Sequence, residues 1–295
     1  MSTLTRREFV TLAAAVPLAA LAQKAGRMYF CMNEVSSANV DFRAAMEGYG
    51  RAGVTHVELF FQPLSAFVMK ESPAVARRVL GDAGLTPVSM ASAGGIVEPT
   101  ATRAASVETW KARLDLARNL GVQRYVVPIL GTQKYTEADY KAAVDNLRDA
   151  GEIATSFGIT AQIEFTRTST LAASLRTALK LVREADHPSV RVMIDTFHFW
   201  AGPSKFEELE ELRDSEVIHV HFEDVPREPI GELLEQRHRV FPGDGIAPLR
   251  RILDVLKRKK YAGALSVEMM DPTIQSMDPY QAAVKARRSV ERLLS

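Results

Sequence analysis

Ionisable side chains end several of the apolar stretches in this sequence. The stretch VRVMIDTFHFW, residues 190–200, places Asp195 and His198 three residues apart directly behind a run of mostly β-branched residues. Three other apolar stretches carry such residues toward their ends: Glu164, His219 with His221, and Glu268. An isolated buried carboxylate is costly unless it is paired, protonated or bound to a cation. Three acids and an imidazole at neighbouring strand ends can share one divalent ion.

The available ligand types narrow the identity of that ion. Cys31 is the only cysteine in the 295 residues, so no intramolecular disulfide and no thiolate cluster can form. We expect Mn²⁺, although Mg²⁺, Co²⁺ and Zn²⁺ accept the same oxygen and nitrogen ligands. The sequence therefore predicts one divalent metal ion held by carboxylates and histidine.

Each of these residues also has a simpler interpretation. Asp195 could only cap the helix that follows its strand, and a lone glutamate at a strand end often lies on a solvated rim. His219 and His221 alternate along one strand and so face the same side. His219 is the deeper of the two, which favours a hydrogen-bonded core histidine, whereas His221 lies nearer the strand exit and is the better ligand.

The elements that would position these residues repeat one theme, a short apolar strand followed by a helical pattern. Eight strands are predicted from β-branched and large apolar residues, over Met28–Met32, Val54–Phe61, Thr86–Ala91, Val122–Ile129, Ile159–Phe165, Val190–Thr196, Val217–Phe222 and Ala264–Met269. The amphipathic helices between them include Val107–Leu120, Ala138–Ser156, Leu171–Glu184 and Leu249–Lys259. Helix C-caps with positive φ are expected at Gly53, Gly84, Gly121, Gly158 and Gly263.

Eight such units predict a single (β/α)8 TIM barrel over residues 27–295. A doubly wound sheet is the main alternative, but no Gly-x-Gly-x-x-Gly follows the first strand and no phosphate-loop lysine motif occurs. The carboxyl ends of the strands form the active site in barrels of this kind. The ionisable residues named above are therefore expected at one mouth of the barrel.

Five motifs in a fixed order make the pattern more specific. They are Glu164, Asp195-x-x-His198, His219-Val220-His221-Phe222-Glu223-Asp224, Arg239-x-x-Pro242-Gly243-Asp244-Gly245 and Ser266-Val267-Glu268. Together they resemble the xylose isomerase-like TIM barrels, and within that group the sugar isomerase and epimerase branch, which includes ketose 3-epimerases, hydroxypyruvate isomerases and inosose dehydratases. The resemblance covers essentially all of the predicted barrel.

The resemblance implies a role for each matching residue. Those that match the metal ligands of the family are Glu164, Asp195, His221 and Glu268. The two glutamates also match the catalytic acid/base pair of the epimerase branch. The implied site therefore uses the same carboxylates to hold the ion and to move a proton.

Two further residues match positions that contact the substrate. His198 matches a substrate-binding histidine, and Arg239 matches an arginine that meets hydroxyl or carbonyl oxygens of the substrate. Arg227 is an alternative for the second role, because the segment Pro226–Glu232 is longer than the loop expected in many relatives.

This set of side chains could support three reactions. An α-hydroxy carbonyl compound can chelate a divalent ion, which then stabilises the enediolate that forms when the carbon-bound proton leaves. Return of the proton on the opposite face gives epimerisation, return to the next carbon gives isomerisation, and loss of a β-hydroxyl gives dehydration. We expect a sugar or polyol isomerase or epimerase with a small carbohydrate substrate. The alternatives are a lyase or dehydratase acting on a keto-sugar or keto-glycoside, and a non-catalytic exported sugar-binding barrel.

Residues 1–22 resemble a twin-arginine-type signal peptide. Arg6 and Arg7 precede the apolar run Val10–Leu21, which is too short to span a bilayer as a helix, and Ala20 and Ala22 are the small residues that signal peptidase needs. We therefore expect a periplasmic or exported protein with no stable membrane insertion after the leader is removed.

The net charge of the chain indicates which classes of binding partner to expect. The chain has 37 basic and 36 acidic residues, and removal of Arg6, Arg7 and Glu8 leaves 35 of each, a formal charge of zero. Such a balance offers no electrostatic footprint for nucleic acid, which argues against the apurinic-site endonucleases that share this barrel. It leaves homo-oligomer formation open.

Replacing Arg6 and Arg7 by lysine should keep the protein in the cytoplasm, because the twin-arginine route reads that pair. Cell fractionation and immunoblotting of the full chain would measure this, with Arg27→Lys as a control outside the leader. Unchanged export of the double variant would show that the leader prediction is wrong.

Overall fold

The strands of the computed structural model, which describes residues 27–91 and 94–295, form a closed parallel barrel. They follow one another around the barrel in sequence order: β1 (Tyr29–Asn33), β2 (His56–Phe60), β3 (Thr86–Ala91), β4 (Arg124–Ile129), β5 (Thr160–Phe165), β6 (Val190–Asp195), β7 (Val217–His221) and β8 (Ala264–Val267). The predicted (β/α)8 fold is confirmed. The expected leader lies outside the described residues.

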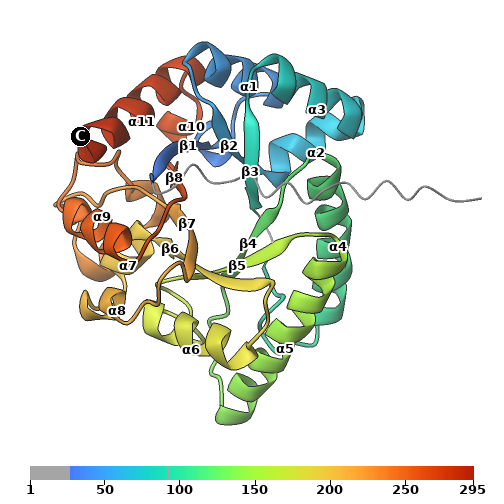
Figure 1. Ribbon diagram of the computed structural model, residues 1–295, viewed down its shortest axis with the longest axis vertical. Coiled ribbons are helices and arrows are strands. Elements are labelled where there is room, and N and C mark those ends of the chain that lie inside the picture. Colours follow the sequence, from blue (N-terminus) through green and yellow to red (C-terminus); the bar gives the residue numbers. More distant parts are fainter. Residues whose placement is uncertain (1–26, 92–93) are drawn as a thin grey trace, which may run out of the picture.

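Helices surround the barrel as an outer ring (Figure 1). They are α1 (Phe42–Arg51), α2 (Phe61–Lys70), α3 (Pro73–Asp82), α4 (Arg103–Asn119), α5 (Glu137–Ser156), α6 (Leu175–Ala185), α7 (Thr196–Ala201), α8 (Glu207–Glu210), α9 (Leu249–Arg258), α10 (Pro272–Gln275) and α11 (Pro279–Leu294). Three short 3₁₀ helices are η1 (Glu34–Ser37), η2 (Gly231–Leu233) and η3 (Gln236–His238). Within the described ranges, no helix combines the length and apolar character that a membrane span requires.

The barrel and its helical ring both close between the two ends of the described chain. Strand β1 pairs with β2 and with β8, and Tyr29 lies opposite Ala264 in the second pairing. Outside the barrel, α11 packs against α1 (Figure 1). Gly48 permits this approach, because a Cβ atom there would lie 2.7 Å from the Cβ of Pro279. The first and last elements therefore hold each other in place.

Local capping explains where the elements begin and end. Helix α6 starts at Leu175 rather than at the predicted Leu171, because the side chain of Ser174 caps the backbone N–H of Thr177. Four of the five glycines expected at C-caps have positive φ, but Gly263 does not. Lys260, with φ of 57°, takes the left-handed conformation after α9 instead, so the prediction for Gly263 is wrong.

A buried carboxyl group follows β1. The side chain of Glu34 is fully buried, and its Oε2 accepts a hydrogen bond from the backbone N–H of Phe60 at 2.8 Å. Its Oε1 has no hydrogen-bond partner among the described residues. Burial raises the pKa of Glu34 to about 8, although the Phe60 hydrogen bond opposes the shift. The fold therefore favours the protonated carboxyl at neutral pH.

Replacing Glu34 by glutamine should remove a pH-dependent loss of stability. At Glu34 the folded state binds more protons than the unfolded state between the ordinary pKa of 4.5 and the raised value of about 8, so the contribution of Glu34 to stability falls as the pH rises through this window. The stability of Glu34→Gln relative to wild type should thus grow by up to about 5 kcal/mol from pH 4.5 to pH 9. Urea unfolding across this range would measure it, with exposed Glu47→Gln as the control. A constant difference would contradict the buried-carboxyl account.

Candidate metal centre

The four predicted metal ligands meet at the C-terminal mouth of the barrel. Their strands are consecutive, and each residue lies at or next to the end of its strand: Glu164 (one residue before the end of β5), Asp195 (end of β6), His221 (end of β7) and Glu268 (directly after β8). One nitrogen or oxygen atom from each lies within 4.8 Å of the others, and all four residues are buried. Nδ1 of His221 is 3.1 Å from Glu164, 3.3 Å from Glu268 and 3.7 Å from Asp195. The donor set is three carboxylates and one imidazole nitrogen.

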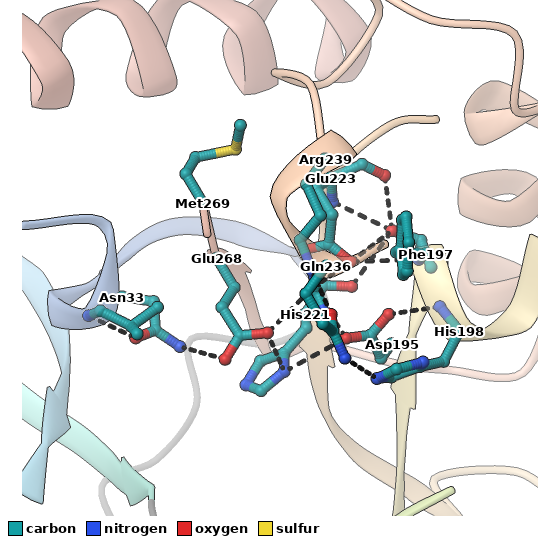
Figure 2. Close-up of polar contacts among 12 residues, drawn as sticks. Asn33, Asp195, Phe197, His198, His221, Glu223, Gln236, Arg239, Glu268 and Met269 are labelled. Atoms are coloured by element: carbon teal, nitrogen blue, oxygen red, sulfur yellow. Dashed lines mark hydrogen bonds and ion pairs between the residues drawn. The ribbon is translucent and has the colours of Figure 1, made fainter. Parts of the chain in front are cut away.

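Asp195 serves the fold and faces the cluster at the same time. Its Oδ1 accepts a hydrogen bond from the backbone N–H of His198 at 2.7 Å and so caps α7. Its Oδ2 is buried and faces the cluster, 3.7 Å from Nδ1 of His221 and 2.9 Å from Nη1 of Arg239. The helix-cap interpretation and the ligand interpretation are therefore compatible, because each uses a different oxygen. Figure 2 shows Asp195, His221 and Glu268 pointing toward one another.

Arg239 enters the same cluster as a buried cation. Its Nη1 lies 2.9 Å from Oδ2 of Asp195, 3.0 Å from Oε1 of Glu223 and 2.8 Å from Oε2 of Glu268 (Figure 2). Burial works against its charge, but these three carboxylates hold the pKa of Arg239 above its usual value. Arg227, the alternative sequence candidate, is solvent-exposed on the loop. The structure thus brings Arg239 into the centre and leaves Arg227 outside it.

Burial and mutual repulsion give the buried carboxyl groups of the cluster different pKa values. Despite its burial, Asp195 has a pKa well below the usual range, because the guanidinium of Arg239 favours the carboxylate. Burial raises the pKa of Glu164 to about 7, and burial together with Asp195 raises that of Glu223 well above its usual value. One imidazole and one guanidinium therefore compensate only part of the negative charge that the cluster could carry.

His198 is oriented by its contacts on two sides. Its Nδ1 accepts a hydrogen bond from the backbone N–H of Arg167 at 3.2 Å, so Nε2 carries the proton of the neutral ring. Burial lowers the pKa of His198 to about 4, which keeps the ring neutral at neutral pH. Nε2 lies 3.1 Å from Nε2 of Gln236. Because both nitrogens are donors in this arrangement, an oxygen atom placed beside them could accept from both.

Gln236 connects the two predicted substrate-binding residues. Its Oε1 accepts hydrogen bonds from Nε and Nη2 of Arg239, at 3.0 and 2.6 Å, while its amide nitrogen faces His198. Gln236 is a solvent-exposed residue of η3, within the extended loop that follows β7. This loop therefore reaches the mouth of the barrel and covers part of it.

The carboxylate of Asp224 fixes the base of that loop. It accepts hydrogen bonds from the backbone N–H groups of Val225, Gly243, Gly245 and Ala247, at 2.8 to 3.1 Å. A Cβ atom on Gly245 would lie 2.2 Å from the carbonyl oxygen of Val225, so only glycine fits there. The Pro-Gly-Asp-Gly motif in the sequence thus marks the close packing that holds Arg239 in the cluster.

An apolar groove of about 540 Å³ adjoins this loop on the same end of the barrel. Its lining residues come from the loops after β5, β6 and β7 and include Arg167, Trp200, Pro203, Pro229, Ile230 and Leu234. The aromatic residues of α7 divide between this groove and the core. Trp200 is 41% exposed and lines the groove, whereas Phe197 is buried with its ring 4.9 Å from the guanidinium carbon of Arg239.

Four polar residues in or beside the centre are given no role by the sequence analysis. They are Asn33, Glu58, Glu223 and Gln236. Glu58 could have been found from the sequence, because it is a charge inside the apolar stretch VELFF. Glu223 lies in a motif that the resemblance already used. Gln236 has no local signal, since its contacts arise only when the extended loop folds over the barrel.

Comparison with known proteins agrees with this architecture. A family model described as "Xylose isomerase-like TIM barrel" matches residues 49–293. Inosose isomerase of Halalkalibacterium halodurans is 27% identical over 192 residues, which cover 64% of this chain and 68% of that protein. A 3-dehydroshikimate dehydratase of Pseudomonas putida is 25% identical over 247 residues, 83% of this chain but only 38% of that protein.

Solved structures share the fold. The crystal structure of the IOLI protein with a bound zinc atom matches with a TM-score of 0.84 at 23% identity, over 91% of this chain and 98% of that one. D-psicose 3-epimerase, crystallised in the presence of D-fructose, matches with a TM-score of 0.70 at 19% identity, over 90% and 98% of the two chains.

Proposed function

The chain belongs to the xylose isomerase-like TIM barrel family, and from this premise we propose that it is a metal-dependent enzyme that isomerises or epimerises a sugar or polyol. The observation that carries the proposal is the buried group of three carboxylates and one imidazole nitrogen at the mouth of the barrel. The relatives named inosose isomerase and D-psicose 3-epimerase support the reaction class.

The residues present fit a divalent cation. Glu164, Asp195 and Glu268 supply buried carboxylate oxygens, which are hard donors that suit such an ion, and His221 adds one imidazole nitrogen. Its holders would be Glu164, Asp195, His221 and Glu268. A bound cation would polarise a substrate carbonyl and stabilise the negative charge left when a carbon-bound proton departs. We propose Mn²⁺, with Zn²⁺ as the alternative that the IOLI structure supports.

Glu164 and Glu268 are the proposed acid/base pair. Glu164 lies in β5 and Glu268 directly follows β8, so their carboxylates approach the centre from different sides of the barrel wall. Oε1 of Glu268 lies 3.4 Å from the Nδ2 donor of Asn33, and its Oε2 pairs with Arg239. Such contacts would keep the carboxylate directed at the centre while it takes or returns a proton.

His198, Gln236 and Arg239 are the proposed substrate contacts. His198 and Gln236 present two N–H donors beside the carboxylate cluster, and Arg239 presents a cation within it (Figure 2). Hydroxyl and carbonyl oxygens of a sugar are the acceptors that these donors match. In this proposal the substrate oxygens replace the present contact between His198 and Gln236.

Dehydration is the second candidate reaction. The dehydratase of Pseudomonas putida aligns with 83% of this chain, whereas the inosose isomerase aligns with 64%. The longer alignment supports dehydration as an alternative reaction. The same proton abstraction would begin both reactions, and loss of a β-hydroxyl would follow only in the second. Product analysis on ketoses and keto-sugars separates them.

The setting of the reaction is also proposed. The twin-arginine pattern of residues 1–22 supports export of the folded, metal-loaded protein to the periplasm or beyond. The proposed partner is a small-molecule carbohydrate, with no nucleic acid and no stable membrane insertion after the leader is removed, and homo-oligomer formation remains open to test.

Metal binding should depend on the four-residue cluster. Protein purified without chelator should hold about one divalent ion per chain, and Asp195→Asn or His221→Ala should lose most of it, because each removes a ligand. Elemental analysis measures the ion content, and His238→Ala is a control histidine on the loop outside the cluster. Equal ion content in all these proteins would remove the site.

Proton transfer should incorporate solvent hydrogen into the product. Turnover of a ketose or an inosose in heavy water should introduce deuterium at the carbon atom whose configuration or bonding changes in the reaction. The reason is that one carboxylate removes a proton and another group returns one from solvent. Glu164→Gln and Glu268→Gln should each lower kcat by about 10²-fold or more. Glu208→Gln, a buried glutamate outside the centre, is the control, and metal content is checked in each sample. Full activity in both variants without deuterium incorporation would exclude the two-carboxylate mechanism.

A further inference from the structure

A second polar group lies inside the barrel, in contact with His221. Glu58 projects from the middle of β2 and is fully buried. Its Oε2 lies 2.7 Å from Nε2 of His219 and accepts a hydrogen bond from the hydroxyl of Ser266 at 2.7 Å. Both carboxylate oxygens of Glu58 lie 3.2 Å from Nε2 of His221. The proposed reaction gives no role to Glu58, His219 or Ser266.

The two nitrogens of His221 therefore face different partners. Nδ1 faces the three carboxylates of the candidate metal centre, and Nε2 faces Glu58. A neutral imidazole has one N–H donor and one lone pair. A carboxylate on the Nε2 side holds the proton there and leaves the Nδ1 lone pair directed at the metal centre.

Distance alone would also permit a cation between Glu58, His219 and His221. That alternative conflicts with the outer site, because one neutral imidazole cannot give lone pairs to two ions at once. The inner group offers only one carboxylate, whereas the outer group offers three. Ser266, which donates to Glu58, already occupies part of its coordination capacity. Hydrogen-bonded support is thus the better account of the inner group.

We propose that Glu58, held in place by His219 and Ser266, is a positioning residue that fixes the orientation and tautomer of His221 for metal binding. The inference rests on the proposed metal site and deepens it. A hydrogen-bonded carboxylate behind a ligating histidine also makes the ligand more basic, and loss of such a partner typically weakens metal affinity 10- to 100-fold.

Glu58→Gln tests the inference at nearly constant volume. The substitution removes the negative charge and places an amide where two histidines require an acceptor. Titration of the metal-free protein with Mn²⁺ or Zn²⁺ against a chromophoric chelator should give a Kd about 10- to 100-fold weaker than wild type. The visible spectrum of the Co²⁺-loaded protein should change as well, because the His221 ligand is no longer held in one orientation.

Ser89→Ala is a matched control inside the same barrel. Ser89 lies opposite Glu58 in the register between β2 and β3 and is fully buried. Its hydroxyl oxygen accepts a hydrogen bond from the side-chain amide of Gln162 and does not contact either histidine. It should leave the metal Kd and the Co²⁺ spectrum unchanged, even where stability falls. Ser266→Ala removes one hydrogen bond to Glu58 and should weaken metal binding several-fold, which keeps the test usable if Glu58→Gln does not fold.

The outcomes separate the inference from the proposed function. Wild-type affinity in both Glu58→Gln and Ser266→Ala would overturn the positioning role and leave the outer metal site intact. Two ions in wild type and one in Glu58→Gln would also overturn it, in favour of an inner ion. Absence of any bound ion in wild-type protein would refute the proposed metal site, and the inference with it. Weaker binding with an altered Co²⁺ spectrum in Glu58→Gln, but not in Ser89→Ala, supports it.

Discussion

Compensation of buried negative charge dominates the mouth of this barrel. The carboxylates of Glu164, Asp195, Glu223 and Glu268 are all buried there, and the cations among them are Arg239 and, when protonated, His221. Carboxylates brought together out of water repel one another unless a cation or protons compensate them. The arrangement is stable only if Arg239 stays in place, some acids hold protons, or a further cation binds.

The surrounding architecture follows from that requirement. Strand ends supply the acids, while Arg239 arrives on the extended loop, whose base is tied to Asp224 through backbone N–H groups. Gly245 permits this close packing. On the other side of His221, Glu58 and His219 fill the barrel interior with hydrogen bonds. The ligand-type residues are therefore held from above by a loop and from below by a buried polar layer.

Much of this arrangement could be predicted from the sequence, because strands, helices and the barrel mouth follow from hydrophobic period and strand order. Asp195, His221 and Arg239 were found this way or through a resemblance, and the structure brings them together. Glu58 lies in the middle of β2 and not at a strand end, so the rule that places functional residues at strand ends does not select it. Gln236 could not be predicted, since its contacts depend on how a long irregular loop folds. Tertiary contacts of that kind produce no repeating pattern of hydrophobic residues in a sequence.

The central proposal for this barrel is a single divalent ion between the three carboxylates and Nδ1 of His221. Anomalous X-ray scattering from crystals grown with Mn²⁺ tests it most directly. The account predicts one anomalous peak among Glu164, Asp195, His221 and Glu268, with Nδ1 of His221 as the nitrogen ligand and Nε2 still in contact with Glu58. A peak between Glu58 and His219, or no peak within the barrel at saturating Mn²⁺, would contradict it.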